Sequence, residues 1–267
     1  MSSRSANPAA ALILPNSFDS ALVCRLARIP VRIGYSRDGR RLLLNPAIQP
    51  PAVGETPAHE RFHYLELLRR AGWIDQLPGN GAPIRLAMNP RPFTDLGLSG
   101  PVIGLSPGAA FGTAKRWLPE RFAESAIGLA KTWGASVAIF GSANERDVAT
   151  QVAGLVETGG VTVRNLAGET KLREFMERIA ACQFFLTNDN GAMHLASAIG
   201  VPTVAVFGST DSTTTGPSGE HSRVVREPVE CSPCLKRECP IDHRCMTRVS
   251  PDRVMRESIE LMSVHSK

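Results

Sequence analysis

Short apolar runs alternate with amphipathic segments along the chain, and the alternation is most regular after residue 100. Short apolar runs bounded by turn residues predict buried strands, and apolar residues that recur every three or four positions predict helices. We predict strands over 102–105, 136–140, 161–165, 184–186 and 203–207, the last of which closes the series, and helices over 119–133, 145–155, 171–181 and 191–199. This alternation indicates βαβ units and a parallel sheet.

The first hundred residues carry a sparser version of the same pattern. Strands are predicted over 10–14 and 31–35, and helices over 17–27 and 57–71. Residues 79–83 and 89–92 are rich in glycine, asparagine and proline, a composition typical of linkers. We therefore predict an α/β protein of two domains, 1–97 and 98–267.

Composition narrows the class of protein only slightly. With 43% hydrophobic and 21% charged residues, the chain resembles an ordinary globular protein. No apolar run approaches the roughly 18 residues of a membrane helix, and the run over 9–14 is too short for a secretory signal, so we expect a cytoplasmic location. A net charge of +5 favours anionic partners, but the basic residues are scattered, which argues against nucleic acid.

Polar clusters follow the predicted strands of the second half, at 106–117, 141–145, 187–191 and 208–211. Parallel strands present these loops at one edge of the sheet, where ligands bind. The first loop combines glycines with Lys115 and Arg116, which suits a diphosphate, and a helix beginning at Gly191 offers the positive end of its dipole. Glu145 and Asp189 could accept hydrogen bonds from sugar hydroxyls. The clusters together predict a nucleotide-sugar site, although each alone is also a common turn.

Three separated motifs, at 107–117, 165–170 and 187–194, resemble the lipopolysaccharide heptosyltransferase family, and 14–18 and 32–35 are similar to it as well. The resemblance runs from about residue 10 to the end. It implies two Rossmann-like domains of the GT-B type, the first of them incomplete, and inverting transfer of heptose from ADP-heptose to the lipopolysaccharide inner core. It implies no cofactor, no metal and no nucleic acid, and it allows peripheral contact with the inner membrane surface.

The resemblance also assigns residues to the substrate-binding site. Lys115 would contact the donor phosphate, and Asp189 and Gly191 would hold the heptose and the diphosphate. Glu145 lies near the family's ribose-binding acid, and His194 is expected to pack beneath the loop as a structural residue. The full set of predicted substrate-binding residues is Lys115, Asp189, Gly191, Asn190, Gly112, Thr113 and Glu145.

The catalytic base has no counterpart in this sequence. The family opens with a strand and a glycine-containing loop whose aspartate is implied to deprotonate the acceptor, whereas this chain resembles the family from a later strand onward. We expect an N-terminal truncation of about 70–80 residues, roughly two βαβ units by size, which would leave the activity of the chain alone open. Asp19 and Asp38 are available carboxylates, but neither lies in the matching motif, so no base is assigned.

Two further motifs suggest metals. Residues 59–63 satisfy the H-E-x-x-H pattern of zinc proteases, but Arg61 places a charge inside it and no third ligand follows, so we interpret the segment as part of an ordinary helix. The second motif could close a tetrahedral zinc site or could hold free thiols, and it consists of Cys231, Cys234, Cys239 and Cys245 with His243 nearby. Cys24 and Cys182 lie in apolar contexts and are predicted core residues.

Three other functions stay open beside the heptosyltransferase. One is another sugar-nucleotide enzyme of the same architecture, such as a different glycosyltransferase or an epimerase. A second is a non-catalytic remnant that binds nucleotide through residues 100–220. A third is a metal-dependent interaction module built around residues 231–245.

Overall fold

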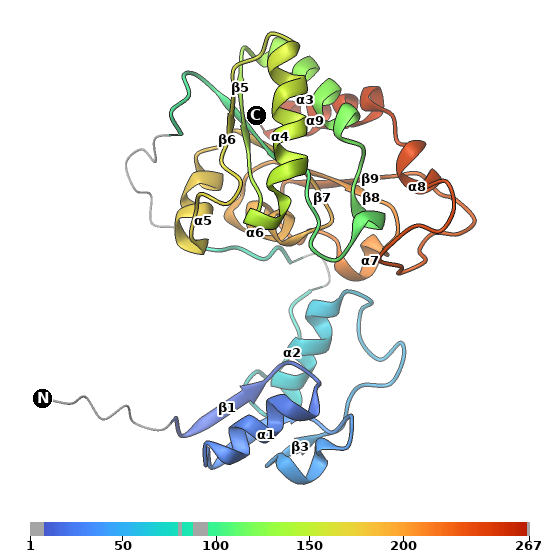
Figure 1. Ribbon diagram of the computed structural model, residues 1–267. Helices are drawn as coiled ribbons and strands as arrows, with labels where there is room; N and C mark the ends of the chain where they lie inside the picture. Colours follow the sequence, from blue (N-terminus) through green and yellow to red (C-terminus); the bar gives the residue numbers. More distant parts are fainter. Residues whose placement is uncertain (1–7, 80–81, 88–95, 266–267) are drawn as a thin grey trace, which may run out of the picture. The chain divides into compact units, whose positions relative to one another are not determined.

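The computed structural model describes residues 8–79, 82–87 and 96–265 and divides the chain into two compact units, Met1–Ala82 and Pro83–Lys267. Both units contain parallel sheets, as predicted for an α/β protein (Figure 1). The division falls earlier than the predicted boundary at 97/98 because 83–87 runs along the second unit, where Ile84 and Leu86 donate their backbone N–H groups to Ser218 and Ala198. Residues 80, 81 and 89–92 of the predicted linkers lie outside the described residues.

The second unit is built on a six-stranded sheet. Its strands are β4 (Val102–Ser106), β5 (Ser136–Ile139), β6 (Val163–Asn165), β7 (Phe184–Asn188), β8 (Thr203–Phe207) and β9 (Ser222–Arg226). All neighbouring strands are parallel, and their spatial order is β6-β5-β4-β7-β8-β9. This is the strand order of a Rossmann sheet, in which the chain reverses direction across the sheet between β4 and β7.

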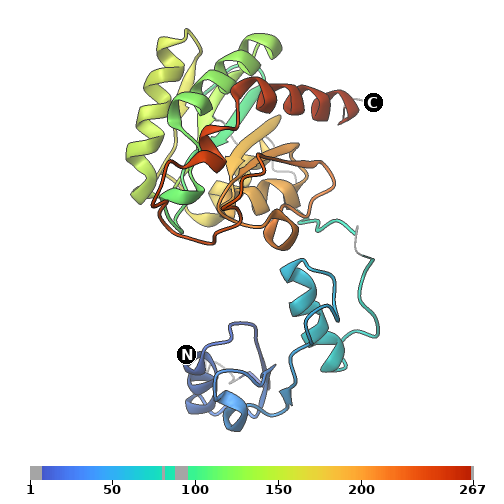
Figure 2. The ribbon, with the colours of Figure 1, turned by 90° about the vertical axis from the view of Figure 1, so that its right-hand side faces the viewer.

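Helices cover both faces of this sheet. The longer ones are α3 (Pro119–Trp133), α4 (Arg146–Thr158), α5 (Leu172–Ala180), α6 (Gly191–Ile199) and α9 (Pro251–His265). Because side chains alternate along a strand, Ile103 and Leu105 pack with α3, α4 and α9, whereas Val102 packs with α5 and α6 on the other face. Helix α9, red in Figure 2, lies beside the green α3.

Helix α3 shows why the sequence folds locally as it does. Pro119 stands at its first position, where a missing N–H costs nothing, and Gly134 ends it in the left-handed conformation with its N–H bonded to the Ala130 carbonyl. Phe122 and Leu129 are fully buried on its inner face. Burying each such side chain contributes about 1.5–3 kcal/mol relative to exposure, so the apolar face holds the helix on the sheet.

The expectation that 203–207 closes the series is wrong, because β9 and α9 follow it. Strand β9 lies at the edge of the sheet, and its Ser-Arg-Val-Val-Arg sequence buries only Val225 fully, so it has too little apolar content to predict a strand. Two short helices, α7 (Ser212–Thr215) and α8 (Arg244–Thr247), also lie in this part. No helix among the described residues is both long and apolar enough to cross a membrane.

Among its described residues, the first unit has a small parallel sheet, two α-helices and a 3-10 helix over Arg40–Leu43. The strands β1 (Ala10–Ile13), β2 (Val31–Tyr35) and β3 (Ala47–Ile48) lie in that order, with α1 (Phe18–Leu26) and α2 (Glu60–Arg70) beside them. Cys24 packs against the cluster formed by Ile13, Ala21 and Leu44, and Cys182 is buried in the second unit, so both predicted core cysteines contact cores.

A fully buried arginine, Arg40, links the ends of β1 and β2 in the first unit. The guanidinium of Arg40 donates to the Tyr35 carbonyl at 2.8 Å, to the Asn16 side chain at 3.0 Å and to the Pro15 carbonyl. Pro15 and Asn16 lie in the segment after β1, and Tyr35 is the last residue of β2. Burial lowers the pKa of Arg40 from its usual value, and the carbonyl dipoles compensate its charge.

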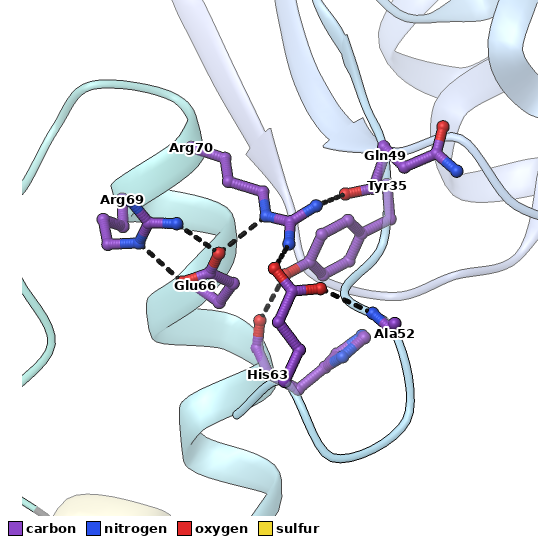
Figure 3. A network of polar contacts seen from close by, with 8 residues as sticks. Tyr35, Gln49, Ala52, His63, Glu66, Arg69 and Arg70 are labelled. Atoms are coloured by element: carbon purple, nitrogen blue, oxygen red, sulfur yellow. Dashed lines mark hydrogen bonds and ion pairs between the residues drawn. The ribbon is translucent and has the colours of Figure 1, made fainter. Parts of the chain in front are cut away.

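Helix α2 carries a buried carboxylate between two arginines (Figure 3). The side chain of Glu66 is 2% exposed and accepts hydrogen bonds from Arg69 at 2.7 Å and from Arg70 at 2.6 Å. The hydrogen bonds from Arg69 and then from Arg70 lower its pKa to about 2, against the opposing effect of burial. Arg70 also contacts Glu55 and donates to the Gln49 carbonyl, so the network fastens α2 to the segment after β3.

Replacing Glu66 with glutamine tests this network. In Glu66→Gln, Arg69 and Arg70 lose their buried carboxylate, so we expect the opening free energy of α2 to fall by about 2 kcal/mol at pH 7. The measurement is amide hydrogen exchange over residues 60–70, compared between variant and wild type at the same pH so that intrinsic exchange cancels.

The pH dependence of this effect has a definite sign. The pKa of Glu66 is lower in the folded chain, so its stabilisation is complete above its unfolded pKa of about 4.3 and is lost as the pH falls through about 2. The ratio of exchange rates should therefore approach one as the pH drops across that window. Glu60→Gln, at an exposed carboxylate of the same helix, is the control. Equal exchange in Glu66→Gln and wild type at pH 7 would contradict a stabilising network.

Candidate functional site

The loops that follow β4, β5 and β7 meet at the carboxyl edge of the second unit's sheet. The parallel register pairs Ser106 with Thr187 at the ends of β4 and β7, which brings 106–117 beside 187–191. A cavity of about 630 Å³ lies there, lined by residues of 106–115, 141–145, 170–175 and 189–195 together with Thr215. Ligands of Rossmann sheets bind at this position, where the strand order reverses.

Two asparagine side chains fasten the loop after β4 to the end of β7. Asn188 is fully buried, accepts the Trp117 backbone N–H at 2.9 Å and donates to the Pro107 carbonyl at 2.7 Å. Asn190 donates to the Gly108 carbonyl at 2.8 Å and accepts the Met193 N–H as the N-cap of α6. Both ends of the loop are therefore fixed by side chains of one turn.

An ion pair forms the polar centre of the cavity. Lys115 Nζ lies 2.6 Å from Asp189 Oδ2, and the two side chains are 15% and 5% exposed. The Thr210 hydroxyl donates to the same oxygen at 2.6 Å, so Asp189 is held from two sides. This arrangement places a primary ammonium group at the cavity wall, beside the N-terminus of α6, where an anion would be stabilised.

Glu145 closes the cavity on the side of β5. Its Oε2 accepts the N–H and the hydroxyl of Ser142, both at 2.8 Å, in a capping box at the 3-10 turn Ala143–Glu145. The remaining oxygen approaches the backbone so closely that a Cβ on Gly108 would lie 2.1 Å from Oε1. A side chain at position 108 would therefore displace the Glu145 carboxylate from this position.

The rest of the wall is largely apolar. Leu172 and Phe175 of α5 and Leu195 of α6 line it, and Phe175 packs edge-on against Phe140 with ring centres 5.7 Å apart. An apolar wall facing a few polar groups suits a ligand with an aromatic and a charged part, such as a nucleotide.

Five of the seven predicted binding residues line this cavity, and two do not. The five are Lys115, Glu145, Asp189, Asn190 and Gly191. Gly112 and Thr113 are not among the lining residues, and Gly112 approaches the carbonyl of Arg237 so closely that a Cβ would lie 2.2 Å from its oxygen. Their place in the binding site stays a prediction.

The expectation that His194 packs beneath the loop is wrong, because its side chain is exposed and lines the cavity. Its position three residues after Gly191 puts it on the face of α6 that points away from the sheet.

The H-E-x-x-H segment, residues 59–63, does not have the geometry of a metal-binding helix. His59 is the N-cap of α2, outside the helix that contains His63, so the two imidazoles do not share a helical face.

The cysteine-rich segment 231–245 packs against the loop after β8, and its Arg237 carbonyl also accepts the Ala114 N–H of the loop that carries Lys115. The N–H groups of Cys234 and Leu235 bond to the Ser209 carbonyl, and a Cβ on Gly208 would lie 2.9 Å from Cys245 Sγ. Burial, followed by the nearby thiols of the other three cysteines, raises the pKa of Cys245 to about 11. Among the described residues, no group of three or more His, Cys, Asp or Glu is arranged to hold a metal, and the metal-site hypothesis stays untested.

Several residues of the site were not predicted from the sequence. Asn188 stands inside the motif 187–194, but its role depends on a loop about 70 positions away. Thr210 lies in a predicted polar cluster, and only the fold places it on Asp189. Phe111 lines the cavity, and Lys115 Nζ lies over its ring, 4.9 Å from the ring centre.

The fold and the cavity match a known class of proteins. Residues 4–244 match the family described as glycosyltransferase family 9 (heptosyltransferase), and the chain belongs to this family. The resemblance drawn from the three motifs is therefore confirmed. The predicted class, Rossmann-like α/β units of the GT-B type, agrees with the solved structures that the chain resembles.

Individual relatives are heptosyltransferases. The lipopolysaccharide heptosyltransferase 2 of Salmonella typhimurium is 34% identical over 263 residues, which are 95% of this chain and 75% of that protein. The lipooligosaccharide heptosyltransferase 2 of Campylobacter jejuni is 34% identical over 164 residues, 60% of this chain and 51% of that protein, so the chain matches about half the length of this relative. The structure of the Escherichia coli ADP-heptose heptosyltransferase II superposes with a TM-score of 0.74 at 31% identity, covering 97% of this chain and 77% of the other.

The role of Asn188 can be tested by removing its side chain. Asn188→Ala leaves the buried Trp117 N–H and the Pro107 carbonyl without partners, so we expect a loss of about 3 kcal/mol in unfolding free energy. Urea unfolding followed by tryptophan fluorescence measures it. Asn144→Ala, at an exposed asparagine of the neighbouring turn, is the matched control. Equal midpoints for the two variants would show that Asn188 does not fasten the loop.

Proposed function

We propose that this chain is an inverting glycosyltransferase that transfers heptose from ADP-heptose to the inner core of lipopolysaccharide. The observation that supports it most is the cavity at the strand-order reversal, where the Lys115–Asp189 pair faces the N-terminus of α6. Its apolar wall suits the nucleoside, and the Lys115 ammonium group beside the start of α6 suits the diphosphate. Membership of family 9 and the heptosyltransferase relatives support the choice of donor.

The proposed reaction is a direct displacement at the anomeric carbon. An acceptor hydroxyl oxygen attacks this carbon, the bond between carbon and the diphosphate oxygen breaks, and ADP leaves with the bonding electrons. Lys115 and the amides at the start of α6 would stabilise the negative charge that develops on the leaving diphosphate. The hydroxyl proton passes to a base that we do not assign to any residue of this chain.

The location and the second substrate belong to the same proposal. The acceptor is a lipid-linked oligosaccharide, so we propose that the enzyme works in the cytoplasm with peripheral contact to the inner membrane surface. The net charge of +5 favours an anionic surface.

Donor binding is tested with substitutions in the ion pair. We expect Lys115→Ala and Asp189→Ala each to weaken ADP-heptose binding about tenfold or more, since one removes a cation and the other releases it from its position. Isothermal titration calorimetry measures this, with Lys131→Ala, an exposed lysine at the end of α3, as the control. Unchanged affinity in both site variants would contradict the assignment.

Transfer itself is tested by incubating the 267-residue chain with ADP-heptose and heptose-deficient core acceptor. Release of ADP with formation of an inverted heptosyl linkage is the expected result. Binding without transfer would instead support a nucleotide-binding remnant. A preference for a UDP-sugar over ADP-heptose in competition would support another sugar-nucleotide enzyme.

A further inference from the structure

The cavity is short of positive charge for the ligand proposed above. Its lining residues include one lysine or arginine, Lys115, and two acidic residues, Glu145 and Asp189, so their formal charges sum to −1 with histidine counted as neutral. Lys115 is moreover paired with Asp189 at 2.6 Å, which compensates its charge. A nucleoside diphosphate is itself an anion, so a cation close by would favour its binding beyond what the amides at the start of α6 provide.

Arg237 of the cysteine-rich segment is such a cation. Its Cζ lies 5.2 Å from the centre of the Phe111 ring, and Lys115 Nζ lies 4.9 Å from the same centre, so the two cations are separated by no more than about 10 Å. Phe111 lines the cavity. Within the part of the chain that the structure describes, the exposed guanidinium of Arg237 forms no ion pair with a carboxylate.

The neighbouring arginine does not serve this purpose. Arg116 follows Lys115 directly, but its Nη2 donates to the Ala109 carbonyl at 3.3 Å and its Nε is buried without a hydrogen-bond partner. Neither Arg116 nor Arg237 is itself a lining residue, so the two arginines differ in what the guanidinium contacts. The Arg116 guanidinium is directed at the backbone of the loop and not at a ligand.

The backbone around Arg237 is held in place against the Lys115 loop. The Arg237 carbonyl accepts the Ala114 N–H at 2.9 Å, and His243 Nε2 lies 3.1 Å from the Ala114 carbonyl oxygen. Leu235 donates its N–H to the Ser209 carbonyl at 2.8 Å. A cation on a fixed backbone loses less freedom on binding than one on a free loop, so this arrangement favours ligand contact.

We propose that Arg237 is the second cation of the diphosphate site and binds phosphate oxygens of a nucleoside diphosphate beside the Phe111 ring. The proposal rests on the proposed function and adds a residue of the cysteine-rich segment to it. A guanidinium presents a planar fork of donors that matches phosphate oxygens, and it keeps its charge at any working pH. The segment 231–245 then contributes directly to donor binding.

The test is calorimetric titration of the full chain with ADP and with adenosine, in the absence of acceptor. We expect Arg237→Ala to bind ADP about tenfold more weakly and adenosine with unchanged affinity, because only ADP carries phosphates. Arg237→Lys should recover part of the loss. Lys236→Ala, at the adjacent exposed lysine, should bind ADP like the wild type. The ADP affinity of Arg237→Ala should also depend less steeply on salt than that of the wild type.

Four results would overturn the assignment of Arg237. The first is that Arg237→Ala binds ADP as tightly as the wild type, and the second is that it loses equal affinity for adenosine and for ADP. The third is that Lys236→Ala loses as much ADP affinity as Arg237→Ala. The fourth is that the thermal unfolding midpoint of Arg237→Ala falls far enough for partial unfolding to explain its weaker ADP binding. Because acceptor is absent, a loss of ADP affinity identifies the donor diphosphate and not an acceptor phosphate as the ligand. A wild-type chain that binds neither ADP nor ADP-heptose would overturn the proposed function together with this inference.

Discussion

Parallel pairing of β4 with β7 is the constraint on which the site depends. The register Ser106–Thr187 brings together two loops that are about 80 positions apart in sequence, and Asn188 then fastens both ends of the first loop through Trp117 and Pro107. With that loop fixed, Lys115 reaches Asp189. The apolar residues of both strands are buried on both faces of the sheet, so slipping this register would break the core as well as the site.

Much of this architecture could be predicted from local pattern, since buried strands and amphipathic helices leave strong periodic signals. Strand β9 could not, because an edge strand with two arginines among its five residues carries little apolar signal. The polar clusters at strand ends could be predicted to converge because parallel strands place them at one edge. The outward position of His194 and the bonds of Asn188 and Thr210 depend on contacts far apart in sequence, which no local pattern encodes.

Two segments of the second unit that lie far apart in the sequence, the Lys115 loop and the cysteine-rich segment 231–245, contact each other in the fold. The Lys115–Asp189 pair is neutral as a whole, and Thr210 holds Asp189 in place. In the proposed function, the Lys115 ammonium group of this pair contacts a phosphate of the donor. The cysteine-rich segment supports the same loop from behind through Ala114 and Arg237. Because the Arg237 carbonyl lies so close to Gly112, a side chain at position 112 would clash with it. The segment therefore supports the Lys115 loop through contacts that do not involve a bound metal.

The most direct measurement is a crystal structure of the chain with ADP-heptose bound. The account predicts the diphosphate at the start of α6, with a phosphate oxygen within hydrogen-bonding distance of Lys115 Nζ and the nucleoside against Leu172 and Phe175. A donor bound elsewhere, or a diphosphate that leaves the Lys115–Asp189 pair untouched, would contradict it.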